Sequence, residues 1–145
     1  MREVFVDTNI LIDLVIKREP FSTYAKSLFA VAEKKSIVMN ICAISYNNVY
    51  YIIRKRLGRE KAKTSLKMFS DTTKCLPVDH TVIHQAMMSQ FRDFEDAIQY
   101  YCALQIPKCE AIITRNIKDF KLSTISVKPP EEFWADEVDI NPFNI

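Results

Sequence analysis

Residues 4–14 read VFVDTNILIDL, an apolar run that is interrupted by the polar residues Asp7, Thr8 and Asn9. The β-branched and aromatic residues before Asp7 predict a short strand at residues 3–6. The residues after it, TNILIDLVI, have helical rather than alternating spacing and predict a helix. Asp7 therefore stands where a strand gives way to a helix. There it either caps the helix, by accepting a backbone N–H group, or holds a metal ion.

Strand-like and helix-like segments alternate along the rest of the chain. Further strands are expected at residues 36–43, 74–79, 110–114 and 123–127. Helices are expected at residues 8–16, 21–35, 45–57, 59–70, 80–90 and 93–105, with a short turn or helix after Pro129. This alternation predicts one α/β domain over residues 1–145, built around a mainly parallel sheet. In such sheets ligands bind beyond the carboxyl ends of the strands, at a topological switch point.

The composition narrows the class of protein. The chain has 145 residues, of which 48% are hydrophobic and 26% are charged, as in an ordinary globular domain. Its net charge of +2 is too small to indicate nucleic-acid binding by itself. The single glycine, Gly58, excludes a P-loop and a G-x-G-x-x-G dinucleotide turn.

The cysteines and the N-terminus indicate a cytoplasmic protein. None of the four cysteines forms a C-x-x-C pair, so a zinc ribbon is not expected, and each is predicted to be a small buried side chain. Unpaired cysteines and a good core fit a reducing compartment. No signal peptide precedes the first strand, and no apolar run approaches ~18 residues, so no association with a membrane is expected.

Acidic and amide side chains follow the strands or begin a helix at three places in the chain. They are Asp7, then Asp93, Glu95 and Asp96 at the start of the helix at residues 93–105, and then Asn116 and Asp119 after the fourth strand. Their oxygens are hard ligands, suited to Mg²⁺ or Mn²⁺. Each group also has a structural alternative, since Asp93 and Asp96 have the spacing of an N-cap and its third-residue partner. The same helix carries an apolar stripe of Phe94, Ile98, Tyr101 and Leu104.

Three segments, VFVDTNILIDL, DFEDAIQYYCAL and AIITRNIKDF, resemble the successive motifs of PIN-domain ribonucleases, particularly toxins of the VapC type. The resemblance implies a Rossmann-like α/β/α sandwich with strand order 3-2-1-4-5 and a metal-dependent endoribonuclease that hydrolyses RNA phosphodiester bonds. It further implies that Asp7 and Asp96 are the principal metal ligands, with Asn116 and Asp119 at the last ligand position. A homodimer and a small antitoxin partner are also implied.

One position departs from the family pattern. Many members carry S-x-x-E early in the helix after the second strand, whereas SYNN places Asn48 at the glutamate position. An amide supplies no negative charge, so the alternative is a weakened or inactive PIN-like binding module, unless Glu95 or Asp93 compensates. A receiver-like phosphoryl acceptor at Asp7 is a more distant alternative, because no lysine follows the fourth strand.

Two further clusters are open to more than one interpretation. RKRLGREKAK, residues 54–63, concentrates six cations that form either a solvated face or a salt-sensitive RNA contact. His80 and His84 are four residues apart, a spacing that can bind zinc, but Thr81 stands where H-E-x-x-H has glutamate. We expect both histidines to lie on the surface.

Overall fold

The computed structural model describes residues 1–137, and within them five strands form a single parallel sheet. The strands are β1 (Glu3–Val6), β2 (Val38–Cys42), β3 (Lys74–Leu76), β4 (Cys109–Ile113) and β5 (Val127–Lys128). Their order is β3-β2-β1-β4-β5, and every neighbouring pair is parallel. The predicted α/β fold and its strand order 3-2-1-4-5 are confirmed. The switch point lies between β1 and β4, where the chain changes the direction in which it adds strands.

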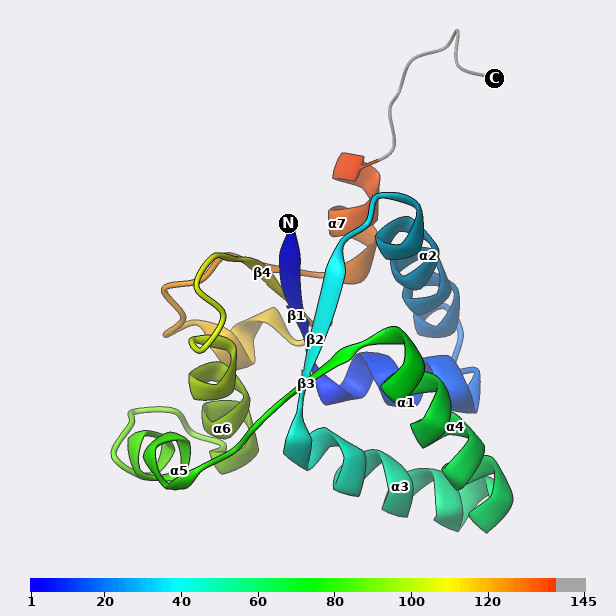
Figure 1. Ribbon diagram of the computed structural model, residues 1–145, viewed down its shortest axis with the longest axis horizontal. Helices are drawn as coiled ribbons and strands as arrows, with labels where there is room; N and C mark the ends of the chain where they lie inside the picture. The colour runs from blue at the N-terminus through cyan, green and yellow to red at the C-terminus, as the bar shows by residue number, and fades with distance from the viewer. Residues whose placement is uncertain (138–145) are drawn as a thin grey trace, which may run out of the picture.

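Helices cover both faces of this sheet (Figure 1). They are α1 (Thr8–Ile16), α2 (Phe21–Lys34), α3 (Ala43–Leu57), α4 (Arg59–Thr72), α5 (His80–Met87), α6 (Phe94–Ala103) and α7 (Pro130–Glu137), with a 3₁₀ turn η1 (Ile117–Phe120). Helices α1 to α4 and α7 lie on one face, and α5 and α6 lie on the other. Right-handed crossovers explain this, because the connection after β3 runs back across the sheet and must place its helices on the opposite face.

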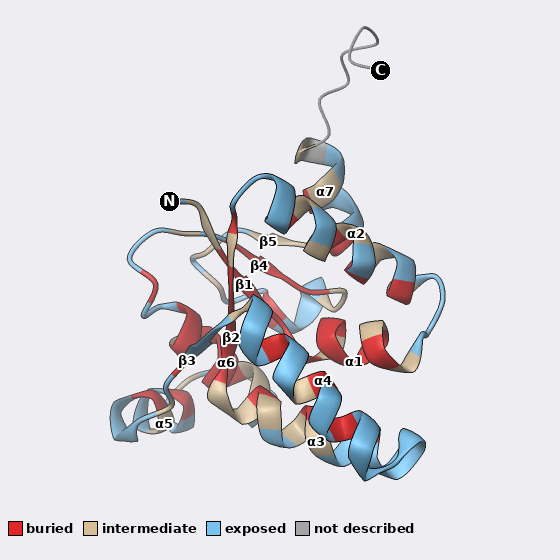
Figure 2. Ribbon diagram, turned by 45° about the vertical axis from the view of Figure 1, so that its right-hand side comes forward, coloured by how far each residue is buried: buried red, intermediate tan, exposed pale blue. Residues whose placement is uncertain are grey.

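Alternation along β1 divides the core into two layers. Val4 and Val6 pack with α1 to α4, whereas Phe5 between them packs with α5 and α6. All three are completely buried, as expected for a strand covered on both faces. Figure 2 shows that burial is concentrated in the central strands and α1, while much of α4 is exposed.

Three strands are shorter than predicted. The second strand spans Val38–Cys42 rather than residues 36–43. The third strand ends at Leu76 rather than at residue 79, since Pro77 has no N–H group to donate to a neighbouring strand. The fifth strand is confined to Val127–Lys128. The predicted helix after Pro129 is present as α7, and the remainder of that tail, residues 138–145, lies outside the described residues.

Helix α6 does not bury the predicted apolar stripe. Ile98 is buried, but Phe94 is 50% exposed and Leu104, which follows the helix, is 43% exposed. The buried face instead includes Ala97 and Tyr100. These residues pack in the core layer that α6 shares with the sheet and α5. The exposed position of Phe94 at the start of α6 is therefore a finding that the apolar spacing did not predict.

The cysteine prediction holds for two residues. Cys42 and Cys102 are buried and Cys109 is half-buried, but Cys75 is exposed because it lies on the edge strand β3. No helix within residues 1–137 has both the length and the apolarity required to cross a bilayer.

Candidate active site at the carboxyl edge of the sheet

Asp7 directly follows β1 and is almost completely buried, with 2% of its surface exposed. Its Oδ1 accepts a hydrogen bond from Gln99 Nε2 at 3.0 Å, and its Oδ2 accepts one from Thr114 Oγ1 at 2.7 Å. Thr114 follows β4, and the register of the two strands places these residues side by side. The carboxylate is therefore held in one orientation at the switch point by α6 and by the end of β4.

The side-chain hydrogen bonds of Asp7 do not support the capping interpretation. The residue occupies the N-cap position of α1, but its carboxylate forms no capping hydrogen bond. Burial raises the pKa of Asp7, while the hydrogen bonds from Thr114 and Gln99 oppose that rise. A buried carboxylate held by two side chains from other elements is a feature of sites more often than of caps.

Gln99 and Ser45 extend this network, although neither was predicted from the sequence to support the site. Gln99 Oε1 accepts hydrogen bonds from the backbone N–H of Thr8 at 3.1 Å and from its hydroxyl at 3.2 Å. The Thr8 and Ser45 hydroxyls also lie 2.7 Å apart. Thr8, Ser45 and Gln99 are all buried, so each needs a polar partner. The available signal was the polar Gln99 within the otherwise apolar segment AIQYYCA.

The predicted acids of α6 have different roles. Asp93 is the N-cap of the helix, since its Oδ1 accepts a hydrogen bond from the Asp96 N–H at 3.0 Å. The capping interpretation is thus correct for Asp93. Asp96 and Glu95 in the first turn are both half-buried and form no such cap.

The acids interact strongly around Asp96. Burial, together with the charges of Asp93, Asp7, Asp119 and Glu95, raises the pKa of Asp96 to about 7. A carboxyl group on which four acids act is strongly disfavoured in its charged form unless a cation is present. The fold therefore brings five of the predicted acidic residues within electrostatic range of one another.

Asn116 and Asp119 are brought to the same edge by the turn after β4. Asn116 is half-buried at the start of η1, and its backbone N–H donates to Thr114 Oγ1 at 3.0 Å. Asp119 is exposed. It lines a groove of about 450 Å³ together with Asp93 and Asp96, and with the cations Arg92, Lys118 and Lys121.

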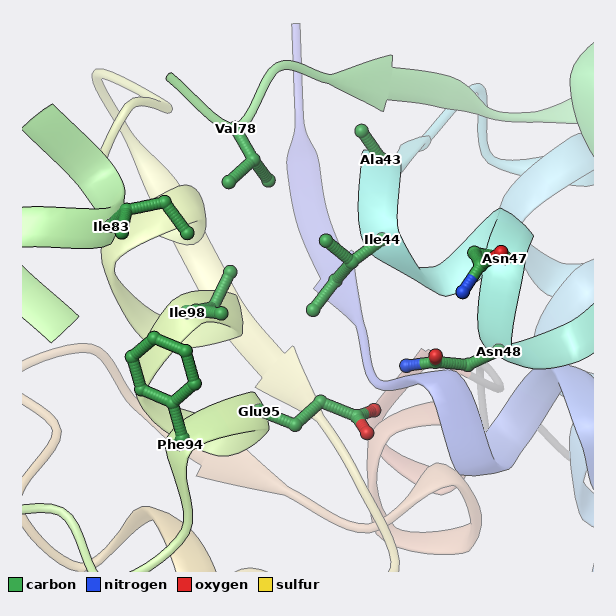
Figure 3. A pocket seen from close by; sticks show the side chains of 9 residues that line it. All are labelled: Ala43, Ile44, Asn47, Asn48, Val78, Ile83, Phe94, Glu95 and Ile98. Atoms are coloured by element: carbon green, nitrogen blue, oxygen red, sulfur yellow. The ribbon is translucent and has the colours of Figure 1, made fainter. Parts of the chain in front are cut away.

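We call the edge of the sheet that carries Asp7, Asp96 and the acids around them the acidic edge. Asn48 faces this edge from α3. Figure 3 shows its amide group and the Glu95 carboxylate pointing toward each other. Burial raises the pKa of Glu95, and the interactions with Asn48 and Thr8 oppose that rise, while the charge of Asp7 adds to it. Glu95 therefore supplies a carboxylate beside the position where the family pattern has its glutamate.

A second buried acid, Asp13, was not singled out from the sequence. It is 1% exposed on α1, and its Oδ2 accepts a hydrogen bond from Arg115 Nε at 2.6 Å. The Arg115 guanidinium also lies 4.8 Å from the centre of the Phe21 ring. This ion pair joins α1 to the segment that carries Asn116. An acid on the buried side of an apolar helix was the available signal.

The two remaining clusters lie on the surface. His80 and His84 are both exposed, as predicted. Their rings are stacked with centroids 6.2 Å apart. The six cations of residues 54–63 are exposed around Gly58, whose φ of 91° allows α3 to turn directly into α4. We call these six residues the basic tip.

The donor set at the acidic edge fits a hard divalent cation in chemistry. Asp7, Asp96 and Asp119 contribute carboxylate oxygens, and Asn116 contributes an amide oxygen. Their mutual repulsion would be relieved by a cation, although within residues 1–137 no three His, Cys, Asp or Glu side chains converge tightly enough to form a finished metal-binding group. The edge therefore matches a divalent cation in the type of its ligand atoms and in its negative charge.

A family model described as the PIN domain matches residues 3–118 of this chain. The chain therefore belongs to the PIN-domain family, and the resemblance inferred from the three motifs is confirmed. A search of curated protein sequences found no match.

Solved structures of VapC-type toxins share this fold. The DNA-bound VapBC of Salmonella typhimurium is 19% identical, covers 90% of this chain and 99% of its own, and superposes with a TM-score of 0.68. A toxin–antitoxin complex from Klebsiella pneumoniae is 25% identical over 88% of this chain and 97% of its own, with a TM-score of 0.63. VapC20 of Mycobacterium tuberculosis, described as a sarcin-ricin loop cleaving toxin, is 18% identical over 75% of this chain and 86% of its own, with a TM-score of 0.62.

Proposed function

We propose that this protein is a Mg²⁺- or Mn²⁺-dependent endoribonuclease and the toxin of a toxin–antitoxin pair. The observation that carries the proposal is the set of crowded carboxylates at the switch point, where burial and four neighbouring acids raise the pKa of Asp96 to about 7. Such crowding reduces stability, and it is typical of sites that bind a cation. Membership in the PIN-domain family supports the same conclusion.

The chain's own residues have distinct roles in this proposal. Asp7 and Asp96 are the principal ligands, and Asn116 and Asp119 complete the set. Gln99 and Thr114 hold Asp7 in place, because a freely rotating carboxylate would lose the geometry that a metal requires. When bound, a divalent cation supplies an acidified water and neutralises charge that develops on the phosphate. Arg92, Lys118 and Lys121 lie in the same groove as Asp96, where they can contact phosphate oxygens of RNA.

The proposed partners are RNA, a small antitoxin and a second copy of the chain. VapBC and toxin–antitoxin complexes among the structures with this fold support the antitoxin, and the description of VapC20 supports an RNA substrate. The second candidate function is a PIN-like binding module without catalysis. Asn48 favours it, since an amide replaces a carboxylate at a position that faces the acidic edge.

Cleavage of single-stranded RNA in the presence of Mn²⁺ distinguishes the two functions. We expect Asp7→Asn and Asp96→Asn each to lose at least about 100-fold in rate, since even the partners of metal ligands are worth 10 to 100-fold. Asp71→Asn, on the exposed face of α4, is the matched control and retains full activity.

Full activity in both edge variants would remove the proposed metal site. A wild-type protein that binds RNA but does not cleave it with any divalent metal would favour the binding module. Thermal melts of each variant establish that a loss of rate is not a loss of fold.

A further inference from the structure

An apolar groove adjoins the acidic edge and is not used by the proposed metal site. It has a volume of about 660 Å³ and lies between the start of α3, α5 and the first turns of α6 (Figure 3). Its lining consists of apolar side chains with a polar rim, namely Ala43, Ile44, Val78, Ile83, Phe94 and Ile98 with Asn47, Asn48 and Glu95. Glu95 belongs both to this groove and to the cluster around Asp7. Whatever occupies the groove therefore lies next to the carboxylates.

Phe94 presents an aromatic surface at the mouth of the groove. It is 50% exposed at the first position of α6, directly before Glu95 and Asp96. Its ring presents apolar surface to solvent, and its neighbours in sequence are the residues of the acidic edge. A flat apolar ring beside a phosphate-processing site is suited to stacking against an unpaired base.

Asn47 and Asn48 line the α3 side of the groove (Figure 3). Each amide offers both a donor and an acceptor, and this combination pairs with the Watson–Crick edges of bases. A carboxylate at Asn48 would accept hydrogen bonds only and would repel phosphates. The amide therefore suits contact with a nucleic acid better than the glutamate of the family pattern does.

We propose that this groove is a base-binding subsite, which takes one unstacked base of a single-stranded RNA next to the phosphodiester at the acidic edge. Phe94 stacks on the base, Ile44 and Ile98 form the apolar floor, and Asn47 and Asn48 read the base edge. The proposal rests on the proposed function for its substrate class. It adds that the base preference of this protein is set at the groove.

Fluorescence anisotropy with labelled ten-nucleotide oligo(A), oligo(U) and oligo(C) RNA in EDTA tests the proposal without cleavage. We expect Phe94→Ala to weaken binding of the preferred RNA about tenfold, as loss of one base stack does, and Phe94→Trp to retain it. Asn48→Ala is expected to bring the affinities for the three RNAs to within about twofold of one another. Tyr51→Ala is the matched control, because Tyr51 is a similarly exposed aromatic residue that does not line the groove, and it leaves binding unchanged.

The subsite would be overturned if Phe94→Ala and Asn48→Ala changed neither the RNA affinity nor the base preference. A protein segment would then be the better candidate for the groove. If Phe94→Ala melts early, Phe94→Leu removes the ring while it keeps an apolar side chain. The two proposals fail separately. If RNA binding depends on Phe94 but the RNA is never cleaved, the subsite is supported and the nuclease function is contradicted. If the protein cleaves RNA with a base preference that Phe94→Ala and Asn48→Ala do not change, the nuclease function is supported and the subsite is contradicted.

Discussion

The acidic edge lies near the start of helix α3 and the basic tip lies at its end. Asp7, Glu95 and Asp96 at the edge are buried or half-buried, whereas the cations at the tip are exposed. At the edge, Asp7 is buried and its two carboxylate oxygens each accept a hydrogen bond. At the tip, all six cations are exposed, and none forms an ion pair among residues 1–137. Buried charge costs stability unless it is partnered, whereas exposed charge costs almost nothing. The buried and half-buried acids of the edge therefore indicate a functional site, because they reduce stability. The exposed cations of the tip have almost no such cost and do not by themselves indicate a function.

The largest expected effect is on the buried ion pair beside the edge. Arg115→Met leaves the Asp13 carboxylate buried, with Arg18 Nε 4.0 Å away as its remaining cation, and should lower the free energy of unfolding by about 3 kcal/mol. Urea denaturation measures this loss. Lys67→Met breaks the exposed Lys67–Asp71 pair on α4 and is expected to leave the midpoint unchanged. Equal effects at the two pairs would contradict the contrast between buried and exposed charge.

The next effect concerns the basic tip. Changing Arg54, Lys55 and Arg56 together to glutamine should weaken RNA binding about tenfold and reduce the salt slope of log K by about 2, if each cation contacts one phosphate. Lys26, Lys34 and Lys35, which are exposed on and just after α2, provide a control triple with the same change in charge. Binding measured from low to high salt separates the two. A tip that is only a solvated face would give the same small change as the control.

A smaller effect with a change of sign is expected at Asn48. Asn48→Glu places a second carboxylate opposite Glu95, so without metal the protein should lose about 1 kcal/mol of stability by like-charge repulsion. With Mn²⁺ the same charge should tighten metal binding about tenfold. Calorimetric titration and thermal melts measure both. Gln85→Glu adds the same charge on the exposed face of α5 and should do neither.

The smallest effect is on the pH dependence of stability. Because the pKa of Asp96 rises from 3.8 to about 7 on folding, the metal-free folded state retains a proton that the unfolded state releases. Stability is therefore highest below pH 4 for this group and is lost as the pH rises through 7. This titration should lower the melting temperature of the wild-type protein by about 3 °C between pH 5 and pH 8. Asp96→Asn should remove this part of the pH dependence. A pH profile that is identical in the two proteins would show that the acidic edge is not crowded.

The chain by itself determined the order of the elements and the residues that reach the edge. Apolar β-branched runs and helical patterns predicted nearly every strand and helix. Because Asp7, Asp96 and Asn116 stand after strands or at a helix start, they were expected near one another. These features depend on local spacing, which a sequence displays directly. The capping role of Asp93 followed from the same kind of local pattern.

Only the tertiary structure decided which polar residues support the site. Gln99 reaches Asp7 across 92 positions, and Arg115 reaches Asp13 across 102, so neither partnership follows from local spacing. The structure also exposes Phe94 although it belongs to the apolar stripe of its helix, because α6 packs on the sheet through a different face. Burial and pairing over long separations are properties of the folded chain, since they depend on which surfaces meet once the sheet has formed.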